Sequence, residues 1–246
     1  SAASDVYKRQ NPVCTRFLES HRDQLPTDLD VIGERYISAV SRELDGWLDT
    51  VDPKEPLGVM FSGGIDSGAI LLLLYDRLLK RGESPQRLKA FTLCVEESGE
   101  DLSQASDFLK AVDLDMFLEA IHVSREDLDI SETIRVIEDY KPLDVQSATM
   151  GLALCRGIRK RYPDWKYLLD GDGGDENLRD YPIEENPELT IRSVLSNPFF
   201  YHEGWGVEAV KHSLTYSGGQ SRGHVRTSAP ASTEGFAGFS PFATPN

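Results

Sequence analysis

Short apolar runs alternate with longer amphipathic stretches through most of this chain. Four runs have the length and apolar content of buried strands, namely residues 57–61, 88–95, 117–123 and 167–170. Five stretches have the three-to-four-residue apolar spacing of amphipathic helices, namely residues 29–47, 68–81, 102–112, 125–140 and 148–162. Strands that alternate with helices favour a parallel sheet. We therefore predict an α/β protein with a doubly wound, mostly parallel sheet and helices on both faces.

Segments outside this alternation divide the chain. Residues 1–10 have no amphipathic period and are interpreted as a non-native, adaptor-derived segment, and residues 11–50 are interpreted as an N-terminal helical segment. Residues 51–216, which include two helical patterns after Tyr181, are assigned to one domain. Residues 217–246 are rich in Gly, Ser, Thr, Ala and Pro without a clear period. They are predicted to form a loop-like tail, with its truncation left open.

Charge and cysteine content restrict the partners of the chain. Its 246 residues include 26 basic and 41 acidic side chains, a formal net charge of −15. Phosphates would be repelled over most of such a surface, so neither nucleic acid nor an anionic membrane is predicted as a partner. No apolar run approaches the roughly 20 residues of a membrane helix, and Cys14, Cys94 and Cys155 form no paired motif. We expect a soluble protein of the reducing cytoplasm.

A glycine-rich turn follows the first predicted strand. It reads Ser62-Gly63-Gly64-Ile65-Asp66-Ser67 and leads directly into a strong helical pattern. The glycines let the backbone approach a ligand, and the start of the helix presents unpaired N–H groups and a positive dipole end, so the turn is predicted to bind phosphate. The Walker and Rossmann spacings are both absent. A plain strand-to-helix turn, with Asp66 or Ser67 as a helix cap, is the alternative interpretation.

A second turn, after the strand at 167–170, is acidic. It reads Asp170-Gly171-Asp172-Gly173-Gly174-Asp175-Glu176. An EF-hand is excluded, because the sixth position is Asp175 instead of glycine and the twelfth is Tyr181 instead of glutamate. In open α/β sheets ligands bind at the carboxyl ends of the strands, where both turns are placed. The acidic turn is therefore interpreted as a magnesium site beside phosphates, with a solvated turn as the alternative.

Both turns resemble motifs of a known enzyme superfamily. The first is similar to the S-G-G-x-D-S pyrophosphate-binding signature of the N-type ATP pyrophosphatases, and Gly58-Val59-Met60-Phe61 is similar to their first strand. The second resembles the G-E-G-x-D-E loop of asparagine synthetases, which faces the pyrophosphate loop across a cleft. The resemblance covers residues 51–181. It implies the adenine nucleotide alpha hydrolase-like fold of this PP-loop superfamily, with ATP and Mg²⁺ as cofactors.

The resemblance also implies a role for each matched residue. Asp66 and Asp175 would be the metal ligands, and Asp172 and Glu176 the catalytic residues. Asp172 stands where the family has its catalytic glutamate, and it reaches less far. The implied nucleotide-binding residues are Met60, Ser62, Gly63, Gly64, Asp66, Ser67, Leu93 and Gly171.

The implied reaction is asparagine synthetase-like amide formation by a ligase of asparagine biosynthesis. A carboxylate, from aspartate or another acid, would be adenylated with release of pyrophosphate, and ammonia or an amine would then displace AMP. No glutaminase domain of the family fits before Asp52, so a separate glutaminase is a candidate partner. The oligomeric state stays open.

Departures from the family pattern keep two other functions open. The later K-x-x-L-R segment, whose lysine stabilises charge at the reacting centre, is absent, and Lys211, Arg222, His224 or Arg226 could supply positive charge instead. A catalytically altered nucleotide-binding homologue is one alternative. Another adenylating PP-loop enzyme, such as a tRNA thiolase, is the second, although the acidic charge and the unpaired cysteines count against it.

Overall fold

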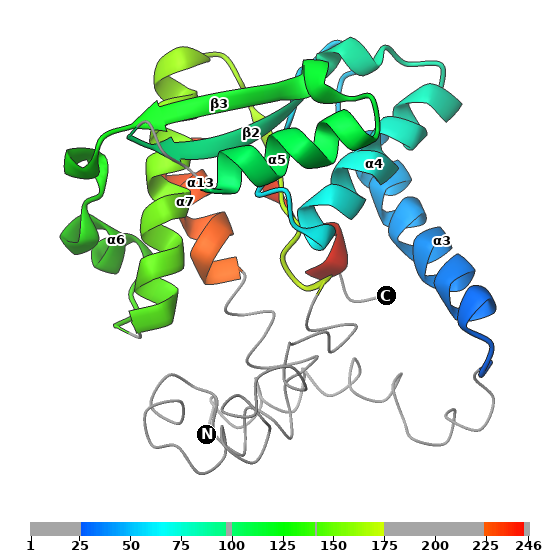
Figure 1. Ribbon diagram of the computed structural model, residues 1–246, viewed down its shortest axis with the longest axis horizontal. Coiled ribbons are helices and arrows are strands. Elements are labelled where there is room, and N and C mark those ends of the chain that lie inside the picture. Colours follow the sequence, from blue (N-terminus) through cyan, green and yellow to red (C-terminus); the bar gives the residue numbers. More distant parts are fainter. Residues whose placement is uncertain (1–25, 97–99, 141, 175–223, 244–246) are drawn as a thin grey trace, which may run out of the picture.

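A parallel sheet of five strands organises the chain, as seen in a computed structural model that describes residues 26–96, 100–140, 142–174 and 224–243 (Figure 1). The strand order is β3-β2-β1-β4-β5, and every neighbouring pair is parallel. The predicted α/β, doubly wound parallel sheet is therefore confirmed. The strands are β1 (Leu57–Met60), β2 (Leu88–Val95), β3 (Leu118–Val123), β4 (Tyr167–Leu169) and β5 (Ala237–Phe239).

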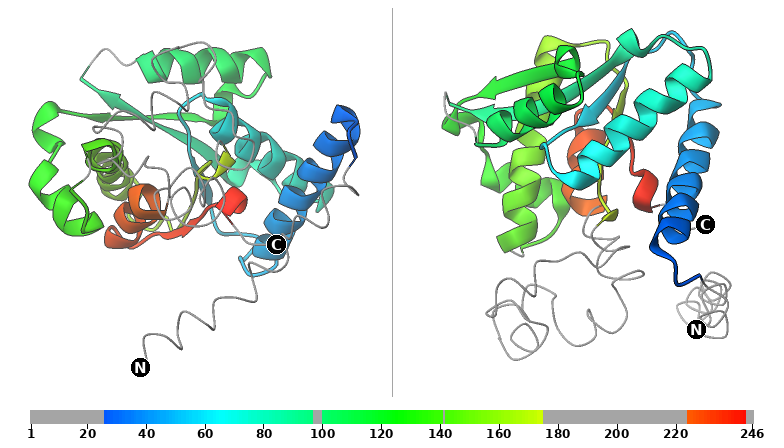
Figure 2. Two further views of the ribbon diagram at one scale, coloured as in Figure 1. Left: turned by 90° about the horizontal axis from the view of Figure 1, so that it is seen from below. Right: turned by 45° about the vertical axis from the view of Figure 1, so that its right-hand side comes forward.

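Helices cover both faces of this sheet. The α-helices in the described ranges are α3 (Leu29–Leu48), α4 (Ile65–Lys80), α5 (Glu100–Ala111), α6 (Ile130–Ile137), α7 (Pro142–Arg161) and α13 (Ala229–Thr233). One core cluster joins α3, α4 and α5 to the sheet, and a second joins α7 and α13 to its other face. Figure 2 shows α3 lying beside α4, away from α7. No helix of the described ranges combines the length and hydropathy that a membrane span requires.

The helix α4 illustrates how the apolar spacing builds the core. Its residues Ile70, Leu71, Leu74 and Leu78 are completely buried, and they recur at the spacing of one helical face. Full burial of such a side chain contributes roughly 1.5–3 kcal/mol. The same face therefore fixes the start of α4, and with it the glycine-rich turn, against the sheet.

The region predicted as one helix over residues 125–140 is divided in two. A single 3-10 turn, Arg125–Asp127, is closed by Asp127, whose carboxylate accepts the Ser124 N–H at 2.7 Å. Asp129 then caps α6 by accepting the Glu132 N–H at 2.9 Å. Because Asp129 forms a new N-cap directly after the 3-10 turn, a separate helix begins there and the turn is not extended into one long helix.

The loop-like tail predicted for residues 217–246 is wrong for the part that the structure describes. His224–Ser228 forms a π-helical turn that leads into α13, and β5 then pairs with β4, with Leu168 opposite Gly238. The Phe239 ring stacks on Trp47 of α3 with 5.1 Å between ring centroids. This segment completes the sheet and the core. The two helical patterns predicted after Tyr181 lie outside the described residues.

The strand order reverses at β1. From β1 the chain steps outward to β2 and then β3, and α6 and α7 carry it back to β4 on the other side of β1. Ligands in open α/β sheets bind at such a switch point, beyond the carboxyl ends of the strands. The glycine-rich turn after β1 and the acidic turn after β4 both begin at this point.

Candidate functional site

The glycine-rich turn is a compact loop held together by its two serines. Ser62 N–H donates to the Ser67 hydroxyl at 3.3 Å, and the two hydroxyl oxygens lie 3.2 Å apart. Gly63 has a φ of +81°, and a side chain there would meet the backbone of Ala105 in α5. The N-cap of α4 is Gly64, and neither Asp66 nor Ser67 occupies that position. The first turn of α4 therefore keeps the character of an anion site.

The acidic turn packs directly against the glycine-rich turn. A Cβ on Gly171 would lie 2.6 Å from the backbone nitrogen of Ser67, and one on Gly174 would overlap the carboxylate of Asp66. Asp170 is 5% exposed, and its N–H donates to the Phe239 carbonyl at 3.2 Å, which ties the turn to β5. The two predicted motifs, far apart in the sequence, thus form one interlocked pair of loops.

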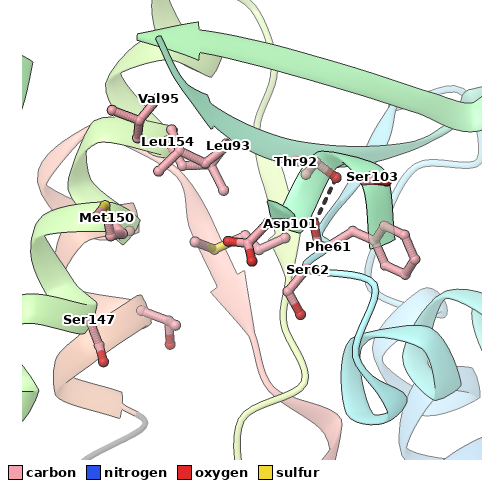
Figure 3. A pocket seen from close by; sticks show the side chains of 13 residues that line it. Phe61, Ser62, Thr92, Leu93, Val95, Asp101, Ser103, Ser147, Met150 and Leu154 are labelled. Carbon is pink, nitrogen blue, oxygen red and sulfur yellow. Dashed lines mark hydrogen bonds between the residues drawn. The ribbon is translucent and has the colours of Figure 1, made fainter. Parts of the chain in front are cut away.

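A pocket of about 860 Å³ opens beside Ser62 (Figure 3). This volume is typical of sites for small molecules and cofactors. Its walls come from the ends of β1 and β2, the start of α5, one face of α7 and the π-helical turn. The lining residues are Met60, Phe61, Ser62, Thr92, Leu93, Val95, Asp101, Ser103, Ser147, Met150, Gly151, Leu154 and Thr227.

The two ends of the pocket differ in chemistry. Leu93, Val95 and Leu154 gather at one end, and Ser62 and Asp101 lie toward the glycine-rich turn (Figure 3). Thr92 donates its hydroxyl to the Phe61 carbonyl at 2.8 Å, which holds the ends of β1 and β2 together. An apolar recess next to an anion-binding loop suits a nucleotide, whose base is flat and apolar and whose phosphates are charged.

Most of the pocket residues from α7 and the C-terminal segment were not predicted from the sequence as site residues. Ser147, Met150, Gly151 and Leu154 recur at i, i+3, i+4 and i+7, so one face of α7 lines the pocket. This spacing is present in the sequence, but a helix that packs one face into the core has the same spacing. It therefore does not identify a pocket wall. Thr227 carries no local signal, because only the packing of the C-terminal segment against α7 places it here.

The predicted nucleotide-binding residues divide between the pocket and the loops. Met60, Ser62 and Leu93 line the pocket. The other five lie in the interlocked turns, and they are Gly63, Gly64, Asp66, Ser67 and Gly171.

The predicted catalytic and metal residues are only partly within the described chain. Asp172 accepts a hydrogen bond from the Thr227 hydroxyl, and its own N–H donates to Asp170 Oδ1 at 3.1 Å. Asp175 and Glu176 lie outside the described residues. No group of three or more His, Cys, Asp or Glu side chains within the described ranges is placed to hold a metal. The pairing of Asp66 with Asp175 stays a prediction.

Arg226, one of the residues considered as a source of positive charge, has a structural partner. Its Nε donates to Asp144 Oδ1 at 2.7 Å, and Asp144 is 1% exposed. Its guanidinium is therefore committed to the contact between the π-helical turn and α7. Lys211 and Arg222 lie outside the described residues, as does the side chain of His224.

Two of the three cysteines are buried. Cys94 donates its thiol to the Glu96 carbonyl at 3.3 Å, and burial raises the pKa of the Cys155 thiol to about 12. A raised pKa disfavours the thiolate, which is the reactive form. The Cys155 thiol is therefore not suited to sulfur transfer. Cys14 lies outside the described residues.

Comparisons with known proteins identify one enzyme family. A family model described as asparagine synthase matches residues 50–228. Asparagine synthetase B (glutamine-hydrolyzing) of Escherichia coli (strain K12) is 26% identical over 174 residues, covering 63% of this chain and 31% of that protein. A protein of Dictyostelium discoideum named "Probable asparagine synthetase [glutamine-hydrolyzing]" is 26% identical over 132 residues, covering 51% of this chain and 23% of that protein. The matched region thus spans a third or less of these relatives.

Proposed function

The chain belongs to the asparagine synthase family, and we propose that it is a ligase that uses ATP to form amides. A substrate carboxylate attacks the α-phosphorus of ATP, which breaks the α–β phosphoanhydride bond and releases pyrophosphate. Ammonia or an amine then attacks the acyl-adenylate, and the acyl C–O bond breaks to release AMP. Aspartate is the first candidate for the carboxylate.

The observation that carries this proposal is the interlocking of the glycine-rich and acidic turns beside a pocket of nucleotide size. Gly171 meets the backbone at Ser67, so groups from β1 and β4 converge where phosphates would lie. Ser62 and the first turn of α4 bind the phosphates, and Leu93 lines the apolar end that takes the base. Holding both reactants in one crevice supplies much of the catalysis in reactions of this kind.

The chain offers groups for the charge and proton transfers of this reaction. The Asp66 carboxylate, in the first turn of α4, is a hard oxygen donor that fits a magnesium ion bound jointly by nucleotide phosphates, and Asp175 is its proposed partner. When bound, Mg²⁺ neutralises charge that develops on the phosphates. Asp172, oriented by Thr227, and Glu176 position the attacking amine or accept its proton.

The proposal is tested by pyrophosphate release. Purified protein is incubated with Mg-ATP, ammonium and single carboxylic acids, beginning with aspartate, and pyrophosphate and AMP are measured together. Release of both that depends on the acid is expected. ATP binding without acid-dependent release for any acid would instead favour a nucleotide-binding homologue that has lost catalysis.

Gly171 provides a prediction about the contact between the two loops. Gly171→Ala would place a Cβ 2.6 Å from the Ser67 nitrogen, so one loop must move. A displacement of about 1 Å at a reacting centre costs roughly 100-fold in rate. We expect a loss of that size in acid-dependent pyrophosphate release.

The matched control is Gly46→Ala, in α3, where a Cβ meets nothing within 4 Å. Alanine is the better helix former, so this control keeps both its activity and its stability. Full activity of Gly171→Ala would mean that the two turns do not have to pack closely for catalysis.

A further inference from the structure

We infer that Asp101 binds the ribose hydroxyls of the nucleotide and makes the pocket selective for ribonucleotides over deoxyribonucleotides. This inference rests on the proposed function, because it assigns one part of the same ATP site. Asp101 lies in the first turn of α5 and lines the pocket, and it is not part of either interlocked turn.

Among the described residues that line the pocket, Asp101 has the one charged side chain. A carboxylate repels phosphates, so it cannot serve the triphosphate directly. Within the described part of the chain its carboxylate forms no ion pair or hydrogen bond. Its acceptor oxygens are therefore available to a ligand with hydroxyl donors.

The position of Asp101 matches the position of a sugar. Figure 3 shows its side chain between Leu93 and Leu154, at the apolar end, and Ser62, at the phosphate loop. A nucleotide has its ribose between its base and its phosphates. With the base at the apolar end and the phosphates at the loop, the ribose faces the Asp101 carboxylate.

The chemistry of the contact sets the selectivity. An ionised carboxylate accepts hydrogen bonds from adjacent 2′- and 3′-hydroxyls, as acidic residues do in dinucleotide-binding folds. Hydrogen bonds to a charged group are stronger than neutral ones, and loss of one typically weakens binding by about tenfold or more. A nucleotide that lacks the 2′-hydroxyl would leave part of this carboxylate without its donor.

The test measures nucleotide affinity by calorimetry and needs no turnover. The full chain, Asp101→Ala, Asp101→Asn and the control Asp115→Asn are titrated with Mg-ATP, 2′-deoxy-ATP and 3′-deoxy-ATP. Asp115 is an exposed carboxylate at the start of the 3-10 turn Asp115–Phe117, and it does not line the pocket. Circular dichroism and the thermal midpoint establish that each variant is folded.

We expect the wild-type chain and Asp115→Asn to bind ATP about tenfold more tightly than 2′-deoxy-ATP. Asp101→Ala should bind the two equally and more weakly than the wild-type chain binds 2′-deoxy-ATP, because the contact with the 3′-hydroxyl is lost as well. Asp101→Asn should keep only part of the preference. An unchanged ATP-to-deoxy-ATP ratio in Asp101→Ala would overturn this inference and leave the proposed function intact. Failure of the wild-type chain to bind ATP at all would overturn both.

Discussion

Asp66→Asn is expected to reduce acid-dependent pyrophosphate release by about 10²–10³-fold, the usual cost of losing one group that stabilises developing charge. Asparagine has nearly the same volume as aspartate, so it can occupy the same space beside Gly174. The substitution removes the negative charge proposed to hold the metal and leaves the fold of the loop. Initial rates are measured at saturating ATP over a range of Mg²⁺ concentrations, because a lost ligand also raises the Mg²⁺ requirement.

The same helix supplies the matched control. Asp76, further along α4, forms ion pairs with Arg77 at 2.6 Å and with Lys80 at 3.0 Å. Asp76 is half-buried and lies outside both turns and the pocket lining, so Asp76→Asn should keep the wild-type rate. A rate for Asp66→Asn within tenfold of wild type at every Mg²⁺ concentration, the lowest included, would show that Asp66 does not hold the metal.

The sequence was sufficient to predict an element of the fold where its apolar run or its helical periodicity extended over many residues. The strand β2 was predicted with both of its ends, because residues 88–95 are apolar except for Lys89 and Thr92, as suits a strand that is covered on both faces. The strand β5 has three residues, Ala-Gly-Phe, with no alternation or apolar run. It is a strand because β4 presents an edge to it and because Phe236 and Phe242 are buried on either side.

A similar division applies to the candidate site. The two turns could be predicted because glycines and carboxylates directly after a strand form a local pattern. In the structure, close contacts at Gly171 and Gly174 bring the two turns together. The wall formed by α7 and Thr227 depends on packing between distant segments. Gly151 illustrates this, since a Cβ there would lie 3.0 Å from the Arg226 carbonyl. No local pattern distinguishes such a close approach from an ordinary helical glycine.

Arg226→Met should lower the free energy of unfolding by about 3 kcal/mol, because the Asp144 carboxylate would stay buried without the cation now 2.7 Å away. Methionine keeps much of the packing of the arginine stem, so the loss reports mainly on the charge. Urea denaturation monitored by tryptophan fluorescence gives the unfolding free energy. Arg135→Met is the control, since Arg135 pairs with Glu132 while 73% of its side chain is exposed, and its midpoint should stay near that of wild type.

The double variant Arg226→Met, Asp144→Leu separates a charge effect from a general loss of packing. Replacing both partners of a buried ion pair by apolar groups is often nearly neutral, so the double variant should regain most of the stability that Arg226→Met loses. Such recovery would mean that residue 226 lies inside the cooperative fold, joined to α7. If Arg226→Met unfolded at the wild-type midpoint, the C-terminal segment would be an appendage, and the pocket wall at Thr227 would have to form only when a ligand binds.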